Sequence, residues 1–315
     1  MSVFRCSEAL LSLLLGVAPI PAFGQSKHPS SAETSPTLPV GLCFTKGAGI
    51  YVQAANQAIP EKWMDAAQAV DVRLSPDGDA LAFTLDTTSY KPTGPVTRHI
   101  AVLEGKGARY YVLDSIPGSN SYGPVWSPDG KLIMFQQYTG NEWHVALVGR
   151  DGSGFRVVYS PPANSTMINN GCWSNDSKYF YCFDFEFLYR IDLSGRVASQ
   201  LAFKDIPLEV SSSTCQFRLS PDGRQMLIET EIEVDDLKND DYPSPVIFLL
   251  DLGSKKARRV SPKGMMLSDP EWLKDGKSFV CRKRDGKKLG IYRIDIESGN
   301  AQLIIPGGKE PSVSR

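Results

Sequence analysis

A four-residue turn motif recurs along the chain and restricts its possible folds more than any other feature. The tetrapeptide Ser-Pro-Asp-Gly occurs at Ser75–Gly78, Ser127–Gly130 and Ser220–Gly223, and degenerate copies occur at Ser174–Ser177 and Leu273–Gly276. A large apolar residue precedes each copy, at intervals of 46 to 53 positions: Leu74, Trp126, Trp173, Leu219 and Trp272. A period of this length indicates a repeat architecture.

The recurring motif has the chemistry of a β-hairpin turn. Proline fixes φ and ends the incoming strand, and the Asp-Gly step tolerates the positive φ that a tight hairpin requires. In the second repeat the apolar run Leu132–Phe135 follows the turn, and two further β-prone runs follow at His144–Leu147 and Phe155–Val158. Four short strands per repeat are typical of a β-propeller blade.

A sixth repeat is divided between the two ends of the chain. Gly41–Phe44, Gly49–Val52 and Lys62–Met64 resemble the second, third and fourth strands of a blade that lacks its first. Glu310–Ser314 resembles the first strand at Asp269–Leu273. We therefore expect an all-β six-bladed propeller whose C-terminal strand pairs with the N-terminal blade and closes the ring. An irregular β-sandwich would predict neither the even spacing nor the complementary ends.

Residues 1–24 are typical of an export signal peptide. Arg5 precedes the apolar stretch Leu10–Pro21, and small residues stand before the expected cleavage point. This stretch is shorter than the roughly 20 apolar residues that a membrane anchor needs, and no later segment is long and apolar enough to span a bilayer. Residues 25–39 are rich in Ser and Pro and predict a flexible linker before the propeller at 40–315. We expect a periplasmic or secreted protein.

The repeat resembles that of the TolB-type six-bladed propellers. The residues that carry the resemblance are the Trp-Ser-Pro-Asp-Gly turn at Trp126–Gly130, the strand Ile133–Phe135, and the Ile-Tyr-x-x-Asp strand at Ile291–Asp295. The resemblance implies an envelope protein or lipoprotein as partner. The same repeat occurs in propellers of the prolyl-oligopeptidase and dipeptidyl-peptidase group. Those enzymes carry a hydrolase domain with a Gly-x-Ser-x-Gly motif, which this sequence lacks, so we do not expect their peptidase activity. TolB proper carries an α/β domain where this sequence has only the short linker.

Charge and histidine content argue against several classes of function. The chain has 34 Lys and Arg against 35 Asp and Glu, and this balance does not fit an extended nucleic-acid interface. His99 and His144 occupy equivalent starts of third strands in neighbouring blades, but no third histidine or carboxylate set accompanies them. We therefore predict no metal site and no cofactor.

The sequence pattern indicates that most of the cysteines are small core residues. Cys43, Cys182 and Cys281 occupy repeat positions where other blades carry Phe. Cys172 and Cys182 are expected on opposite faces of one sheet, which disfavours a disulfide between them. A disulfide between Cys172 and Cys215, on adjacent inner strands, stays open as an alternative.

Three polar, uncharged loops lead into inner strands and are expected around one mouth of the central channel. They are residues 119–122, 164–170 and 211–214, and variable loops on a rigid scaffold commonly carry binding residues. Two functions remain open: a non-catalytic scaffold for an envelope protein or lipoprotein, or a secreted propeller enzyme or carbohydrate-binding protein. A peptide or glycan would suit these loops. The candidate binding residues are Tyr122, Asn164, Asn169, Asn170, His99 and His144.

Overall fold

The computed structural model divides the chain into two units, Met1–Glu33 and Thr34–Arg315, and all described residues belong to the second. The predicted signal peptide, most of the predicted linker and the candidate residue Asn164 lie outside the described residues. The described ranges are 36–88, 95–163, 165–210, 212–232, 244–285 and 288–314. No helix in these ranges is long and apolar enough to cross a membrane.

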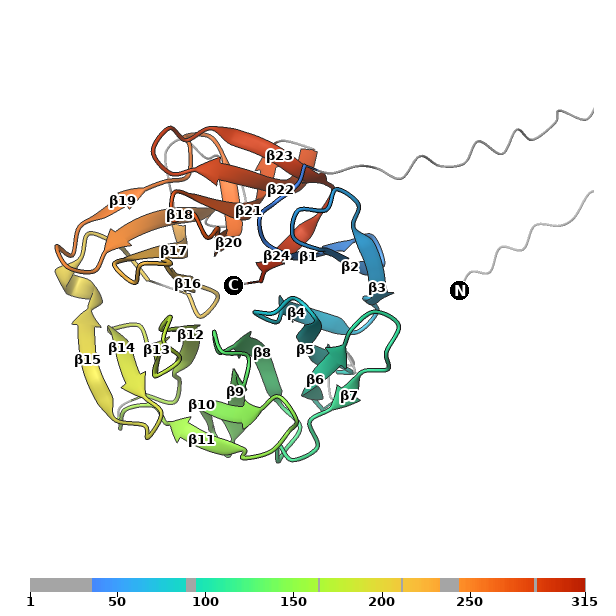
Figure 1. Cartoon of the computed structure of the whole chain (residues 1–315). Coiled ribbons are helices and arrows are strands. Elements are labelled where there is room, and N and C mark those ends of the chain that lie inside the picture. Colours follow the sequence, from blue (N-terminus) through green and yellow to red (C-terminus); the bar gives the residue numbers. More distant parts are fainter. Residues whose placement is uncertain are drawn as a thin grey trace, which may run out of the picture. The chain divides into compact units, whose positions relative to one another are not determined.

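The second unit is an all-β six-bladed propeller of four-stranded antiparallel sheets, as predicted (Figure 1). Blade 1 consists of β4 (Ala69–Leu74), β5 (Ala80–Asp86), β6 (Arg98–Glu104) and β7 (Tyr111–Val112). Blade 2 consists of β8 (Ser121–Trp126), β9 (Leu132–Thr139), β10 (Glu142–Gly149) and β11 (Arg156–Tyr159). Blade 3 consists of β12 (Asn169–Trp173), β13 (Tyr179–Phe183), β14 (Phe187–Asp192) and β15 (Val197–Ala202), followed by the 3₁₀ helix Phe203–Asp205.

The remaining blades complete the ring. Blade 4 consists of β16 (Gln216–Leu219), β17 (Gln225–Ile232), β18 (Ser244–Asp251) and β19 (Ala257–Arg259). Blade 5 consists of β20 (Met266–Trp272), β21 (Ser278–Asp285), β22 (Lys288–Asp295) and β23 (Ala301–Pro306). Blade 6 consists of β24 (Lys309–Val313), β1 (Leu42–Lys46), β2 (Gly49–Gln53) and β3 (Glu61–Asp65). The first-named strand of each blade lies innermost, around the centre of the ring (Figure 1).

Blade 6 closes the ring with both ends of the chain. β24 pairs with β1 in antiparallel register, with Leu42 opposite Val313. The Ser314 hydroxyl accepts a hydrogen bond from the Gly41 backbone N–H at 2.8 Å, and the Ser314 N–H donates to the Gly41 carbonyl at 2.9 Å. The Ser312 hydroxyl accepts from the Leu74 N–H at 3.0 Å and so ties β24 to blade 1 as well. The predicted closure by the C-terminal strand is confirmed.

The serine of the recurring turn motif holds the hairpin in the blades that carry it. In blade 2 the Ser127 hydroxyl donates to the Asp129 carboxylate at 2.6 Å and accepts from the Leu132 backbone N–H at 2.9 Å. Gly130 lies at φ +70°, which confirms the positive φ expected for this turn. In blade 5, where Leu273 replaces the serine, a hydroxyl on the other side of the turn takes its place: the Ser278 hydroxyl donates to Asp275 at 2.6 Å. A small Ser–Asp network thus recurs in the first hairpins of blades 1 to 5.

The tryptophans that precede three of the turns link neighbouring blades. The Nε1–H of Trp126 donates to the Arg73 carbonyl at 3.1 Å, and that of Trp173 donates to the Val125 carbonyl at 3.0 Å. Trp272 makes the same bond in blade 5, to the inner strand of blade 4. Each indole is almost fully buried, so it both fills the space between two blades and satisfies an inner-strand carbonyl.

The core lies between the blades, in six clusters of buried apolar side chains. Cys43, Cys182 and Cys281 are fully buried in these clusters, where they pack as small apolar residues. None of the five described cysteines forms a disulfide. The Cys172–Cys215 disulfide that the sequence left open is therefore not formed, although both residues pack in the cluster between blades 3 and 4.

Candidate functional site

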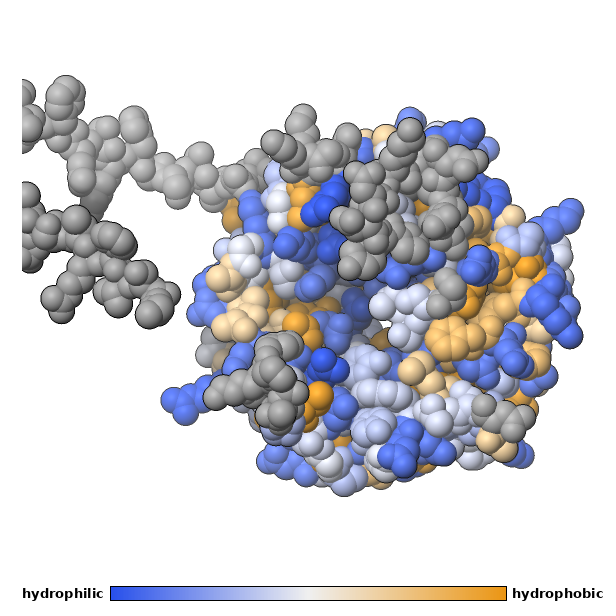
Figure 2. Space-filling view, turned by 180° about the vertical axis from the view of Figure 1, so that it is seen from behind, coloured by the Kyte–Doolittle hydropathy of each residue, from blue (hydrophilic) through white to orange (hydrophobic). Residues whose placement is uncertain are grey.

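The face that carries the loops entering the inner strands is hollowed at the channel mouth; we call it the loop face. Figure 2 looks onto this face and shows the hollow near its centre, surrounded mostly by hydrophilic surface. The hollow, which we call the funnel, is a cavity of about 280 Å³ formed by the inner strands of blades 1 to 4 and their neighbours. Its polar lining includes Asp71, Arg73, Tyr122, Gln136, Asn170 and Arg218.

A repeated bulge in the inner strands shapes this lining. Asp71, Gly123, Asp269 and Glu310 occupy equivalent positions in four blades, and all four have φ between +51° and +68°. The pairing register shifts at each of these positions. A bulge of this kind bends a strand and redirects its side chains. Three of the four positions carry a carboxylate although glycine suits this conformation best, so the polar side chain is kept at some cost in backbone strain.

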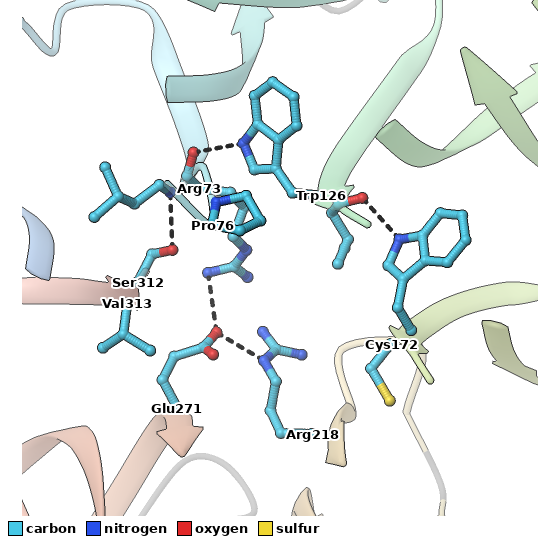
Figure 3. Close-up of a pocket in the computed structure, with 11 residues that line it drawn as sticks. Arg73, Pro76, Trp126, Cys172, Arg218, Glu271, Ser312 and Val313 are labelled. Atoms are coloured by element: carbon cyan, nitrogen blue, oxygen red, sulfur yellow. Dashed lines mark hydrogen bonds and ion pairs between the residues drawn. The ribbon is translucent and has the colours of Figure 1, made fainter. Parts of the chain in front are cut away.

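The floor of the funnel is a cluster of three charged side chains. Below the funnel the channel narrows to a cavity of about 40 Å³ (Figure 3). There the Glu271 carboxylate accepts a hydrogen bond from the Arg218 Nε–H at 2.7 Å and lies 3.8 Å from the Arg73 guanidinium. Because these residues come from blades 5, 4 and 1, their side chains close the channel from several sides. The funnel therefore narrows onto a charged floor.

Two carboxyl groups beside the channel, those of Glu229 and Glu310, have raised pKa values. Burial raises the pKa of Glu229 to about 8, and the neighbouring Asp269 carboxylate adds to the effect. Burial, followed by the charges of Asp269 and Asp71, also raises the pKa of Glu310. Among the described residues, no group of His, Cys, Asp and Glu has the arrangement of a metal site.

Tyr122 lies in the wall of the funnel, at the edge of an aromatic cluster. Its ring meets the Trp143 ring edge-on at 5.1 Å between centroids, and Tyr138 packs against the same indole at 5.0 Å. The Arg98 guanidinium lies 5.6 Å from the centre of the Tyr122 ring. Within the described ranges the Tyr122 hydroxyl has no hydrogen-bond partner, so it is free to bind a ligand. Burial raises the pKa of Tyr122, which keeps the hydroxyl protonated.

The two adjacent asparagines of β12 point to opposite sides, as the alternation of a strand requires. Asn170 lines the funnel, and its Nδ2 donates to the Gly123 carbonyl at 2.7 Å. Asn169 is 1 % exposed and does not line the funnel. Its Oδ1 accepts from Gln136 at 3.2 Å, while its Nδ2 has no partner in the described part of the chain. Asn169 therefore packs behind the funnel wall and contacts the lining residue Gln136, whereas Asn170 itself lines the funnel.

The two candidate histidines lie further from the channel. His99 is on β6 and His144 on β10, each two strands out from the inner strand, and neither lines the funnel. His144 is buried, with its Nδ1 3.0 Å from the Ser160 hydroxyl. Of the candidate residues, the structure thus brings Tyr122 and Asn170 together in one cavity.

Sequence reasoning missed the charged residues of the channel. Arg73, Arg218 and Glu271 each stand one position before the large apolar residue that precedes a turn. Aligning the repeats shows charge at this position in three blades, against Val125 and Cys172 in blades 2 and 3. The aligned repeats thus mark these three positions as charged, but they do not show that the three side chains meet across the ring.

The fold and the funnel define the class of protein: a six-bladed propeller with a polar cavity on its loop face. No protein-family model matches the sequence, and no curated protein matches it. Solved structures with the same fold include TolB from Acinetobacter baumannii, at TM-score 0.62 and 14 % identity, with 87 % of this chain and 66 % of that chain covered.

Two further structures show how widely the fold is shared. A putative TolB from Agrobacterium tumefaciens has a TM-score of 0.58 at 14 % identity, covering 89 % of this chain and 98 % of that one. A chain of the nidogen–laminin complex has a TM-score of 0.60 at 8 % identity, covering 88 % and 98 %. At these identities the likeness establishes the fold, and function must be argued from the site.

Proposed function

We propose that this protein is an exported, non-catalytic propeller that binds an envelope protein or lipoprotein through its loop face. The observation that carries the proposal is the polar funnel that narrows onto charged side chains, because a concave wall of hydrogen-bonding groups suits a segment that inserts from outside. Tyr122 offers ring area together with a free hydroxyl, the combination that is frequent among residues dominating binding energy.

The chemistry of the lining supports binding over catalysis. The described lining combines amides, hydroxyls and charged side chains, and neither His99 nor His144 is among them. Asp71 accepts a hydrogen bond from the Thr84 hydroxyl at 3.1 Å, and that hydroxyl is fully buried and also accepts from the Gly123 backbone N–H at 3.0 Å, as in a structural contact. The resemblance to TolB propellers points in the same direction. The likeness to a chain of the nidogen–laminin complex adds that this fold also occurs in a protein assembly.

A carbohydrate-binding propeller is the second candidate, and one observation favours it. Tyr122 lies beside the amides of Asn170 and Gln136 in one cavity, and an aromatic face next to amide groups also suits a sugar ring. A glycan in place of a protein as the captured molecule would select this alternative.

The test is capture from an envelope extract with two matched variants. Tyr122→Ala removes the aromatic wall of the funnel, and Tyr110→Ala removes an exposed aromatic ring outside the funnel, between β6 and β7. We expect wild type and Tyr110→Ala to capture the same molecule, quantified by mass spectrometry, and Tyr122→Ala to lose it while melting nearly unchanged. If Tyr122→Ala melts early and still captures the partner, Tyr122 is a packing residue and the site is wrong.

A further inference from the structure

Arg73 lies at the base of the funnel, and its guanidinium N–H groups donate no hydrogen bond within the described ranges. Its side chain is 17 % exposed and lines both the funnel and the narrow cavity below. Among the described residues its one ion pair is with Glu271, at 3.8 Å, which is longer than a hydrogen bond. Across the described ranges the guanidinium donates no hydrogen bond, although it carries several N–H donors in a planar fork.

Glu271 cannot fully neutralise Arg73, because it is already bound by a second arginine. Arg218 donates its Nε–H to Glu271 at 2.7 Å, and its other donors reach the Phe217 carbonyl at 3.0 Å and the Gln216 side chain at 2.7 Å. Two guanidinium groups thus share one carboxylate at the floor of the channel (Figure 3). Unpaired charge is costly where water is scarce, so the floor favours an additional anion.

Two further acids beside the funnel, Asp71 and Glu310, do not bind the Arg73 guanidinium directly. Asp71 bonds to Thr84 at 3.1 Å, and Glu310 is 3.4 Å from the Thr45 hydroxyl; neither forms an ion pair with Arg73 in the described structure. Burial raises the pKa of Glu310, and the charge of Arg73 acts in the opposite direction. Asp71 in the wall also limits the charge of a ligand, because it would repel a doubly charged phosphate more strongly than a singly charged carboxylate.

We propose that the funnel receives a carboxylate of a partner peptide and that Arg73 is the residue that binds it. A C-terminal carboxylate and an Asp or Glu side chain share this chemistry, and an arginine fork can hold either one through two parallel hydrogen bonds. The peptide would pass Tyr122 and Asn170 on its way to the floor. The inference rests on the proposed function and specifies the chemical group that the funnel recognises.

Three pools of fluorescent peptides of otherwise neutral composition test the inference. The first pool has free C-terminal carboxylates, the second has amidated ends with one internal Glu, and the third has amidated ends without any acid. We expect wild type to bind the first or the second pool at least about tenfold more tightly than the third. The pool that binds identifies the source of the carboxylate. Raising NaCl from about 50 to about 300 mM should weaken only this binding.

Variants assign the effect to Arg73. Arg73→Gln should reduce binding of the acidic pool to the level of the third pool, and Arg73→Lys, which keeps the charge but loses the fork, should fall between. Arg224→Gln changes an exposed arginine in a turn remote from the funnel and should bind like wild type. Thermal melting of each variant checks folding. If Arg73→Gln melts early, the Arg73→Lys comparison decides.

Two results would overturn the inference. One is equal binding of all three pools, or of none, by wild type; the other is unchanged preference for the acidic pool in Arg73→Gln and Arg73→Lys. If capture from envelope extract still depends on Tyr122 in either case, the proposed function survives and only the carboxylate anchor fails. If capture does not depend on Tyr122, the funnel itself is not the site.

Discussion

Glu229 is a buried residue of β17, and its carboxyl group accepts a hydrogen bond from the Asp269 backbone N–H at 2.7 Å. Burial raises its pKa from an ordinary 4.5 to about 8, so the folded protein holds a proton that the unfolded chain releases. Its contribution to stability is therefore complete below about pH 4.5 and is lost as pH rises toward 8. Glu229→Gln, which cannot ionise, should remove this loss.

The measurement is the free energy of unfolding in urea between about pH 5 and about pH 8. Relative to the variant, the wild type should lose roughly 1.4 kcal/mol per pH unit across this window. Carboxylates with lowered pKa values, such as Asp192, have the opposite pH dependence, but they are present in both proteins and cancel in the difference. Parallel profiles of wild type and variant would contradict the raised pKa.

Gly130 tests the turn chemistry at a single residue. At φ +70° an added Cβ meets only Pro76 Cδ at 3.9 Å, so the expected cost comes from backbone strain and not from crowding. Gly130→Val should lower the free energy of unfolding by about 1 kcal/mol or more. Gly253→Ala, at a turn glycine without positive φ, should be close to neutral. Equal effects at the two positions in a urea melt would show that the turn conformation does not matter.

Between elements, the indole bonds are the repeated link from blade to blade. Trp173 is 1 % exposed and donates to the Val125 carbonyl in β8, so Trp173→Phe keeps an aromatic ring but leaves that carbonyl unpaired. We expect a loss of about 1 to 3 kcal/mol of unfolding free energy. Trp63→Phe, at a half-buried tryptophan of β3, is the matched control and should cost less. Comparable losses in denaturant titrations would mean that ring volume alone explains the conserved position within the repeat.

For the whole molecule, ring closure is the feature on which cooperativity depends. Deleting Gly307–Arg315 removes β24, which leaves β1 with an unpaired edge facing the channel. We expect loss of cooperative thermal melting, or aggregation, and partial recovery when a peptide of the deleted sequence is added. A truncated protein that melts like wild type would show that closure by β24 is dispensable.

The ring could be predicted from the sequence because its signals are local. Hairpin turns, strand lengths and the split sixth blade each leave a pattern within a short segment of sequence. Each pattern can be recognised without knowing which residues it contacts in the fold. Tyr122 and Asn170 could be placed at the channel mouth for the same reason, since they follow loops that enter inner strands. The Arg73–Glu271–Arg218 cluster could not be predicted from local signals, because its two contacts join residues 53 and 198 positions apart in the chain. The second of these, between Arg73 and Glu271, forms only when the ring is closed.

We propose that the funnel, and not another surface, contacts the partner. Photo-crosslinking can test this: benzoylphenylalanine replaces Tyr122 in one protein and Tyr110 in another, and both are irradiated in the same envelope extract. We expect one dominant adduct from position 122, lost when Arg73→Gln is added, and none from position 110. An adduct from position 110 with none from position 122 would contradict it.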